Sequence, residues 1–317
     1  YAAAQVRAGA ALLLDGVLAN PHSNASAVDG LAANPAIRTA NAVRAARAET
    51  LAFLGTDPAT HTAVFTAGAT AALKLVGECF AWSRDSVLCY LHDNHNSALG
   101  VREYARAAGV PDAAVRTFDD AAAFLAHARD TLARAPGAQH LVVLPLQSNF
   151  DGAKHSTAVV AALRRMQAEH ADARVAAGST GFRVLLDAAA WVPHSALDLR
   201  AVAADYTCLS FYKVFGLPTG LGALVLRNDT ALRALAHKTY FGGGTVSVSL
   251  QDTCHHVLRD TLAERFEDGT LPFLAIAALH AGFDALRRLA TPAGAPAEAP
   301  AGAPAGAPTA TPSEALH

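Results

Sequence analysis

Lys213 follows a short apolar stretch, YTCLSF at 206–211, that predicts a buried strand. A lysine at the end of such a strand can be partly removed from water. That favours the neutral amine, which can form a Schiff base with a carbonyl compound. An ordinary surface lysine is the competing interpretation, and spacing alone favours it. Lys213 is therefore a candidate for covalent chemistry that needs support from its neighbours.

Asp187 closes a second apolar stretch, RVLLD at 183–187. A carboxylate in such a place can keep a pyridine nitrogen protonated, as enzymes that use pyridoxal 5′-phosphate (PLP) require. The competing interpretation is a helix N-cap, because aspartate is favoured there. A lone aspartate at a strand end is more often a helix cap, so the assignment of Asp187 to a pyridine nitrogen also needs support from neighbouring residues.

Three further polar segments contain groups that could bind an anion or an aromatic ring. The GAT turn at 68–70 opens a predicted helix, whose free N–H groups and threonine hydroxyl suit a phosphate, although simple N-capping also explains them. His95 could stack on a ring, although a surface-loop histidine is the default interpretation. The GGGT segment at 242–245 could approach a phosphate, but it lacks the ending of a nucleotide P-loop.

Short apolar stretches alternate with helical patterns along most of the chain, which predicts an α/β fold with a mostly parallel sheet covered by helices on both faces. Ligands of such sheets bind beyond the carboxyl ends of the strands. The GAT turn, the DNHNS turn, QSN, Asp187 and Lys213 all fall at or just after predicted strand ends, so we expect them at one edge. The predicted strands are 61–66, 86–91, 140–146, 183–188, 206–211 and 222–227, and the predicted helices are 3–18, 38–54, 67–82, 98–108, 119–134, 156–170 and 273–290.

The composition indicates a globular protein, with 52% hydrophobic and 16% charged residues in 317. A formal net charge of -2 without runs of like charge argues against a nucleic-acid surface or a polybasic membrane patch. No apolar stretch has the roughly 18 residues that cross a bilayer. The four cysteines form no C-x-x-C pair, which argues against a structural zinc site. The apolar surroundings of Cys79, Cys89 and Cys208 favour reduced thiols in a cytoplasmic protein.

The chain divides by pattern into four parts. Residues 1–19 form an N-terminal helical segment, and 20–272 form the large domain that contains all the candidate site residues. A helix at 273–290 is expected to begin a second, truncated small domain. The Ala/Pro/Gly-rich stretch at 291–317 is expected to be a disordered tail, because it cannot bury enough apolar surface to offset its ordering entropy.

Seven segments occur in an order that resembles the aminotransferase class V (cysteine-desulfurase-like) family, and within it the N-terminal PLP domain of the molybdenum cofactor sulfurases. They are FTAGATAALKLVGECFAW, DNHNSALGVR, PLQSNFDG, LLDAA, SFYKVFGLPTGLGALVL, KTYFGGGT and RFEDGT. The resemblance covers about residues 10–290 by our reading. It implies the PLP-dependent transferase fold type I. Tyr212, where other desulfurases tend to have histidine, points to the sulfurase branch.

The resemblance also implies roles around the cofactor ring. Lys213 would bind PLP covalently and then move protons, Asp187 would pair with the pyridine nitrogen, and His95 would stack on the ring. Asn149 would reach the ring hydroxyl or the carboxylate side of the substrate. Ala190 stands where desulfurases place a glutamine, so that contact is expected to be absent or replaced.

Around the phosphate, the resemblance implies that Ala69, Thr70 and Ser210 hold the group. Thr245 would reach the phosphate of the neighbouring subunit in a homodimer. The implied reaction transfers sulfur from L-cysteine through a cysteine thiolate to the molybdenum cofactor, which activates xanthine dehydrogenase and aldehyde oxidase.

The family places its nucleophilic cysteine after RFEDGT, where this sequence runs into the Ala/Pro-rich stretch. None of the four cysteines occupies that position, and Cys254 alone has a polar, His-flanked context. The family's opening segment and its molybdenum-cofactor-binding C-terminal domain are also expected to be missing. Two alternatives therefore stay open: a cysteine desulfurase that serves another acceptor, and an inactive PLP-binding fragment.

Overall fold

The computed structural model describes residues 2–14, 34–170, 181–229 and 234–290. The tail predicted at 291–317 lies outside the described residues. So do residues 15–19 of the predicted N-terminal segment.

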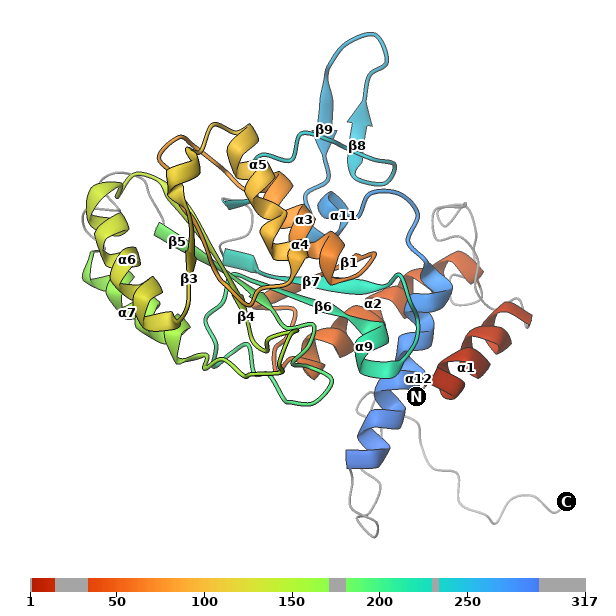
Figure 1. The fold of residues 1–317 in the computed structure, drawn as a ribbon. Helices are drawn as coiled ribbons and strands as arrows, with labels where there is room; N and C mark the ends of the chain where they lie inside the picture. Colours follow the sequence, from red (N-terminus) through yellow and green to blue (C-terminus); the bar gives the residue numbers. More distant parts are fainter. Residues whose placement is uncertain (1, 15–33, 171–180, 230–233, 291–317) are drawn as a thin grey trace, which may run out of the picture.

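A seven-stranded sheet forms the centre of the fold, in the order β1-β7-β6-β5-β4-β2-β3 (Figure 1). Each neighbouring pair is parallel except the two pairs made by β7, which runs antiparallel to β1 and β6. The carboxyl ends of the parallel strands therefore share one edge of the sheet. The strands are β1 (His61–Thr66), β2 (Leu88–Leu91), β3 (Val115–Phe118), β4 (Gln139–Pro145), β5 (Gly181–Asp187), β6 (Tyr206–Ser210) and β7 (Gly222–Arg227).

Helices cover both faces of the sheet, which confirms the predicted α/β fold. Along β4, Val142 and Leu144 pack into a core with α2, α6, α7 and α12, whereas Leu141 and Val143 pack into a second core with α3, α4, α5 and α11. Consecutive side chains of a strand point to opposite faces, so an unbroken apolar strand supplies both cores. The helices are α2 (Pro35–Phe53), α3 (Ala69–Cys79), α4 (Asn96–Leu99), α5 (Val101–Ala107), α6 (Ala121–Arg134), α7 (Ala158–Glu169), α9 (Phe211–Phe215), α11 (Leu262–Phe266) and α12 (Phe273–Ala290).

Helix α12 lies beside α1 (Ala2–Leu14) and α2, at one end of the molecule (Figure 1). Its Ile276, Leu279 and Phe283 are buried in the core that also contains side chains of the main sheet. Helix α12 therefore shares a core with the large domain. The predicted domain boundary before residue 273 stays a prediction.

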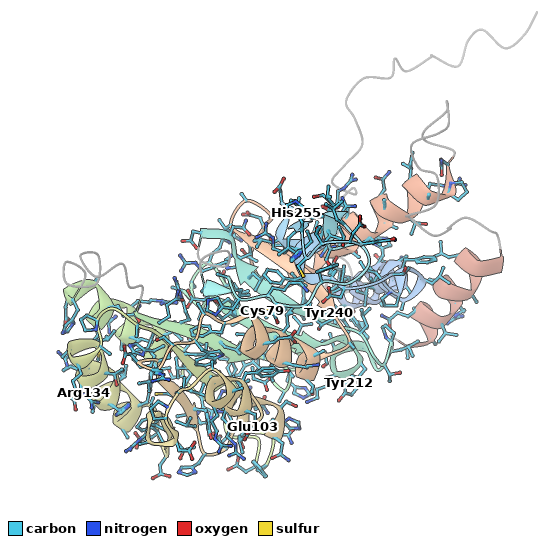
Figure 2. The ribbon with its side chains drawn as sticks, turned by 90° about the horizontal axis from the view of Figure 1, so that it is seen from above. Cys79, Glu103, Arg134, Tyr212, Tyr240 and His255 are labelled. Atoms are coloured by element: carbon cyan, nitrogen blue, oxygen red, sulfur yellow. The ribbon has the colours of Figure 1, made fainter. Side chains whose placement is uncertain are left out.

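A two-stranded hairpin projects from the main body (Figure 1). Its strands β8 (Val246–Ser249) and β9 (His256–Leu258) pair antiparallel. Val248, Leu250 and Val257 are exposed although they are large and apolar. Figure 2 shows His255 on this hairpin and Tyr212 on α9, in different parts of the fold.

Two of the differences between predicted and observed elements have a clear local cause. The helix predicted at 98–108 is two helices, α4 and α5, which meet at Gly100. Glycine lowers helix stability, which explains a break there. The strand predicted from Ser86 begins at Leu88, because the Ser86 hydroxyl accepts a hydrogen bond from Ser83 N and holds a turn.

Candidate functional site

A cavity of ≈ 160 Å³ lies at the carboxyl edge of the main sheet. Segments that follow β1, β2, β4, β5 and β6 contribute to its lining, as expected for parallel strands. All but one of the predicted site residues line it. These are Ala69, Thr70, His95, Asn149, Asp187, Ser210 and Lys213.

The turn between β1 and α3 forms one wall of the cavity. Gly68 has φ 127°, a conformation that L side chains rarely adopt, and it lets the chain enter α3 directly. Ala69 N donates to Ser210 Oγ at 2.8 Å. The next two N–H groups, of Thr70 and Ala71, have no acceptor within the helix. An anion at this helix N-terminus would meet free donors and the positive end of the helix dipole.

Gly222, the first residue of β7, allows this turn to approach the sheet. A Cβ atom there would lie 2.6 Å from Gly68 Cα, closer than real Cβ contacts. Gly222 also pairs with Ser210 in β6 and Thr66 in β1. A glycine is therefore required where three backbone segments meet beneath the helix N-terminus.

Asp187 lies at the end of β5 with 9% of its surface exposed. Its Oδ1 accepts a hydrogen bond from Ala189 N at 3.1 Å and a weak one from Cys208 Sγ at 3.6 Å. The chain after Asp187 forms turns, so the competing interpretation as a helix N-cap is wrong. A carboxylate buried at the cavity wall suits a cationic or protonated ring nitrogen.

Lys213 lies in α9, the short helix that starts directly after β6. Phe211, Val214 and Phe215 are buried and fix this helix against the core, whereas Tyr212 and Lys213 line the cavity. Lys213 is half-buried, and Tyr212 is 43% exposed. The amine and the carboxylate of Asp187 therefore border the same small space, next to a helix N-terminus.

The DNHNS turn after β2 is held on both sides. Asn94 is buried, and its amide donates to Leu91 O and Val143 O, both at 3.1 Å. Asp93 Oδ2 lies 2.6 Å from His155 Nε2, which ties this turn to the segment after β4. His95 lines the cavity between these anchors.

Sequence reasoning assigned no role at the site to four other lining residues: Asp93, Ser97, Gln147 and Tyr212. Gln147 Oε1 is buried and has no hydrogen-bond partner among the described residues. A buried acceptor without a partner is unusual in a folded protein, and here it belongs to a residue that lines the cavity. The motifs DNHNS and QSN could have identified Asp93, Ser97 and Gln147, because these polar residues stand close to the predicted site residues His95 and Asn149.

Thr245 lies outside the cavity, before the β8–β9 hairpin. It is fully buried, and its hydroxyl donates to Gly242 O at 2.8 Å and accepts from Gly242 N at 3.0 Å. Its predicted contact with the phosphate of a neighbouring subunit stays a prediction. Within this chain, the Thr245 hydroxyl stabilises the glycine-rich turn.

The KTYFGGGT and RFEDGT motifs contact each other. Asp268 accepts from Lys238 Nζ at 2.9 Å and from Gly242 N at 2.8 Å. Glu267, which is buried, accepts from Arg47 at 2.7 Å and from Phe65 N at 2.7 Å. Because β1 is an edge strand of the sheet, Glu267 caps an N–H group that no strand covers. These two motifs therefore support the site from outside.

None of the four cysteines lines the cavity. Cys79, Cys89 and Cys208 are buried free thiols, as predicted, and Cys254 is exposed. Burial raises the pKa of the Cys79 thiol to about 12, and it also raises the pKa values of the Cys89 and Cys208 thiols well above their usual range. These three are neutral thiols at ordinary pH and poor nucleophiles.

The described part of the chain contains no group of three or more His, Cys, Asp or Glu side chains that could hold a metal ion. Among the same residues, no helix is both long and apolar enough to cross a membrane.

Comparisons with known proteins identify relatives of the chain. Over 291 residues the chain is 42% identical to the molybdenum cofactor sulfurase of Bos taurus, which covers 87% of this chain and 30% of that protein. It is 37% identical to molybdenum cofactor sulfurase 2 of Culex quinquefasciatus, covering 93% of this chain and 35% of that protein. The chain thus spans about a third of the length of the curated relatives it matches.

Solved structures share the fold. An apo cysteine desulfurase from Thermococcus onnurineus NA1 superposes with a TM-score of 0.65 at 22% identity, over 90% of this chain and 64% of that one. A mutant of C-DES with glycine covalently linked to its PLP cofactor has a TM-score of 0.65 at 18% identity, over 90% and 68% of the two chains. The sequence pattern of the aminotransferase class-V family matches residues 8–294. The chain belongs to this family.

Proposed function

We propose that the chain binds PLP in the cavity and catalyses sulfur transfer from L-cysteine to the molybdenum cofactor, as a molybdenum cofactor sulfurase-like domain. Xanthine dehydrogenase and aldehyde oxidase would be the enzymes activated. One observation carries the proposal: Lys213, Asp187 and the N-terminus of α3 border a single cavity. The 42% identity to the bovine sulfurase supports this choice within the family.

The residues around the cavity fit PLP group by group. The free N–H groups of α3 suit the phosphate, together with Ser210. Asp187 suits the pyridine nitrogen, and His95 suits the ring face. Asn149 and the unpaired Oε1 of Gln147 are polar groups for the ring hydroxyl or the substrate.

When bound, PLP supplies an electron-withdrawing ring that stabilises negative charge next to the substrate's amino group. Lys213 provides the amine that holds the cofactor and, once free, takes up and returns a proton at Nζ. Asp187 keeps the ring nitrogen protonated because its buried carboxylate favours the cation. Tyr212, beside Lys213 on α9, contributes a hydroxyl at the same wall.

Sulfur transfer also needs a cysteine thiolate to attack the substrate sulfur. The buried thiols of Cys79, Cys89 and Cys208 do not serve, because burial raises their pKa values and they lie outside the cavity. We propose that the thiolate belongs to another segment of the complete protein. On its own, this chain then binds PLP and L-cysteine without releasing alanine or sulfide.

Two other functions have specific support. The cysteine desulfurase fold favours a desulfurase that serves another acceptor. The buried cysteines favour a PLP-binding fragment without sulfur chemistry.

The exposed apolar hairpin supports a homodimer. The buried reduced thiols support a cytoplasmic protein.

The test is to express the chain, add PLP, and record its absorbance before and after adding L-cysteine. We expect an absorbance band of protein-bound PLP in the wild type and in Lys74→Ala, a control lysine on the exposed side of α3. The band should be lost in Lys213→Ala. L-cysteine should change the band without releasing alanine. Well-folded wild-type protein without any band would refute the cofactor assignment.

A further inference from the structure

Three polar side chains form a continuous hydrogen-bond chain along one wall of the cavity. Thr70 Oγ1 lies 2.8 Å from Ser97 Oγ, and Ser97 Oγ lies 3.0 Å from His95 Nδ1. The backbone N–H of Ser97 donates to the same His95 Nδ1 at 3.2 Å. The chain therefore joins the first turn of α3 to the imidazole through one serine.

The direction of these hydrogen bonds follows from the backbone group. A backbone N–H can only donate, so His95 Nδ1 must present its lone pair to Ser97 N. In the neutral imidazole the proton is then on Nε2. Because Nδ1 is an acceptor, the Ser97 hydroxyl donates to it, and the Ser97 oxygen accepts the hydroxyl proton of Thr70. Each hydroxyl therefore donates in one direction only: Thr70 donates to Ser97, and Ser97 donates to His95 Nδ1.

Capping of α4 explains only part of this arrangement. His95 is the N-cap residue of α4, and its acceptance from Ser97 N is the capping bond. A cap requires neither the Ser97 hydroxyl nor its link to Thr70 on another helix. His95 Nε2 has no hydrogen bond among the described residues, so it is the ring nitrogen that remains to bind a ligand.

We propose that Ser97 is a positioning residue that fixes the neutral tautomer of His95, so that the ring presents an Nε2–H donor to the cavity. The proposal deepens the function above and rests on it, because it gives His95 a defined role beside the cofactor. With the ring on the face of the cofactor, Nε2–H lies in the plane of the imidazole and donates to an anionic or carbonyl oxygen of the substrate. Ser97 acts through His95 and through the Thr70 hydroxyl.

The Thr70 hydroxyl has one proton to donate, and the Ser97 oxygen and a bound phosphate would compete for it. In the present arrangement the proton points to Ser97, so the Thr70 backbone N–H is the donor that remains for a phosphate. If the hydroxyl turns to a bound phosphate, Ser97 keeps its donation to His95. The His95 tautomer is therefore expected to persist when the anion binds.

The direct test is NMR of protein labelled with ¹⁵N-histidine, without cofactor. Long-range ¹H–¹⁵N correlations separate a protonated ring nitrogen from an unprotonated one, and His95→Gln assigns the signals. We expect wild-type Nδ1 to be unprotonated and Nε2 protonated in the neutral ring. In Ser97→Ala the backbone N–H still donates to Nδ1, so the Nε2–H tautomer should stay the major form while the fraction of the Nδ1–H tautomer rises. Ser97→Thr, which keeps the hydroxyl, should restore the wild-type pattern.

The second readout is the affinity for PLP. Loss of one hydrogen bond that holds the imidazole should weaken PLP binding roughly three- to tenfold in Ser97→Ala and much less in Ser97→Thr. Thr70→Val should leave the His95 tautomer unchanged, because Ser97 keeps both of its donors to Nδ1. Unchanged signals from the other histidines will show that each variant is folded.

A protonated Nδ1 in the wild type would overturn the proposal. So would a Ser97→Ala variant with an unchanged tautomer and unchanged PLP affinity. The NMR result does not depend on the cofactor. If the wild type binds no PLP but shows the Nε2–H tautomer, the proposed function fails while the hydrogen-bond direction stands.

Discussion

The carboxyl edge of the main sheet and the β8–β9 hairpin differ in what their side chains leave unsatisfied. At the sheet edge, polar groups from several strand ends converge on a cavity, and Gln147 Oε1 is buried without a partner among the described residues. Before the hairpin, Thr245 satisfies its hydroxyl within its own turn, while Val248 and Leu250 face solvent. The sheet edge thus has the character of a small-molecule site, and the hairpin has that of a protein contact.

The largest expected effect is at the sheet edge, in Asp187→Asn. This change keeps the shape of the side chain but removes the charge against the ring nitrogen. We expect the exchange of the α-hydrogen of L-alanine with D₂O, which requires PLP and Lys213 but no thiolate, to slow about 10³-fold. NMR follows the exchange. Asp198→Asn, at an exposed position, is the matched control and should keep the wild-type rate. A rate within threefold of wild type in Asp187→Asn would contradict the assigned role.

The second effect concerns the strand that leads to the site. His140 in β4 is buried, accepts from Val87 N at 3.1 Å and lies 3.2 Å from Ala135 O. Burial lowers its pKa from 6.5 to about 4. At neutral pH the ring is neutral in both states, but below pH 6.5 the unfolded chain takes up a proton that the folded chain refuses. Stability is therefore lost as the pH falls from 6.5 towards 4, by on the order of 3 kcal/mol in all.

Urea unfolding at about pH 7 and about pH 5 measures this loss. His140→Gln is expected to be less stable at neutral pH but to lose less stability on acidification. His92→Gln, at an exposed position just after β2, should keep the wild-type pH dependence. An identical pH dependence in wild type and His140→Gln would remove His140 as the cause.

Apolar stretches predicted the sheet well because burial on both faces leaves little choice of residue. The bounds of β1, β7 and α12 agree with the predictions, and the seven predicted cavity residues lie together because parallel strands end at one edge. In contrast, β3 was missed. It is an edge strand with half-exposed ends and an exposed middle, so its residues show no apolar pattern.

Contacts between residues far apart in the sequence could not be predicted from it either. Ser97 is an ordinary turn serine until α3 brings Thr70 next to it. The pairing of Asp93 with His155 likewise depends on how β2 and β4 lie in the sheet. The hairpin was missed although VSVSL at 246–250 alternates apolar and polar side chains, because β9 has only three residues and one short alternating stretch does not show what it pairs with.

A third prediction compares two glycines, one from each region. In Gly222→Ala the new methyl group would overlap the Gly68 turn, so the turn and the N-terminus of α3 must shift. We expect a loss of about 2 kcal/mol in the free energy of unfolding, together with weaker PLP binding. Gly243→Ala meets no atom within 4 Å and should change neither quantity in the monomer. Equal effects of the two substitutions, measured by urea unfolding and PLP titration, would contradict the distinction between the regions.

The smallest expected effect on folding is at the hairpin, in the double variant Val248→Ser with Leu250→Ser. Both side chains are about half exposed, at 46% and 50%, so their loss should change the stability of the monomer by less than about 0.5 kcal/mol. If the hairpin contacts a second copy, the same variant should weaken dimerisation in sedimentation velocity. Val6→Ser, which removes an exposed apolar side chain of α1, is the matched control. A wild-type monomer, or a dimer that tolerates the double variant, would contradict the inference that the hairpin contacts a second copy. In either case PLP binding should persist at the sheet edge, because no hairpin residue lines that cavity.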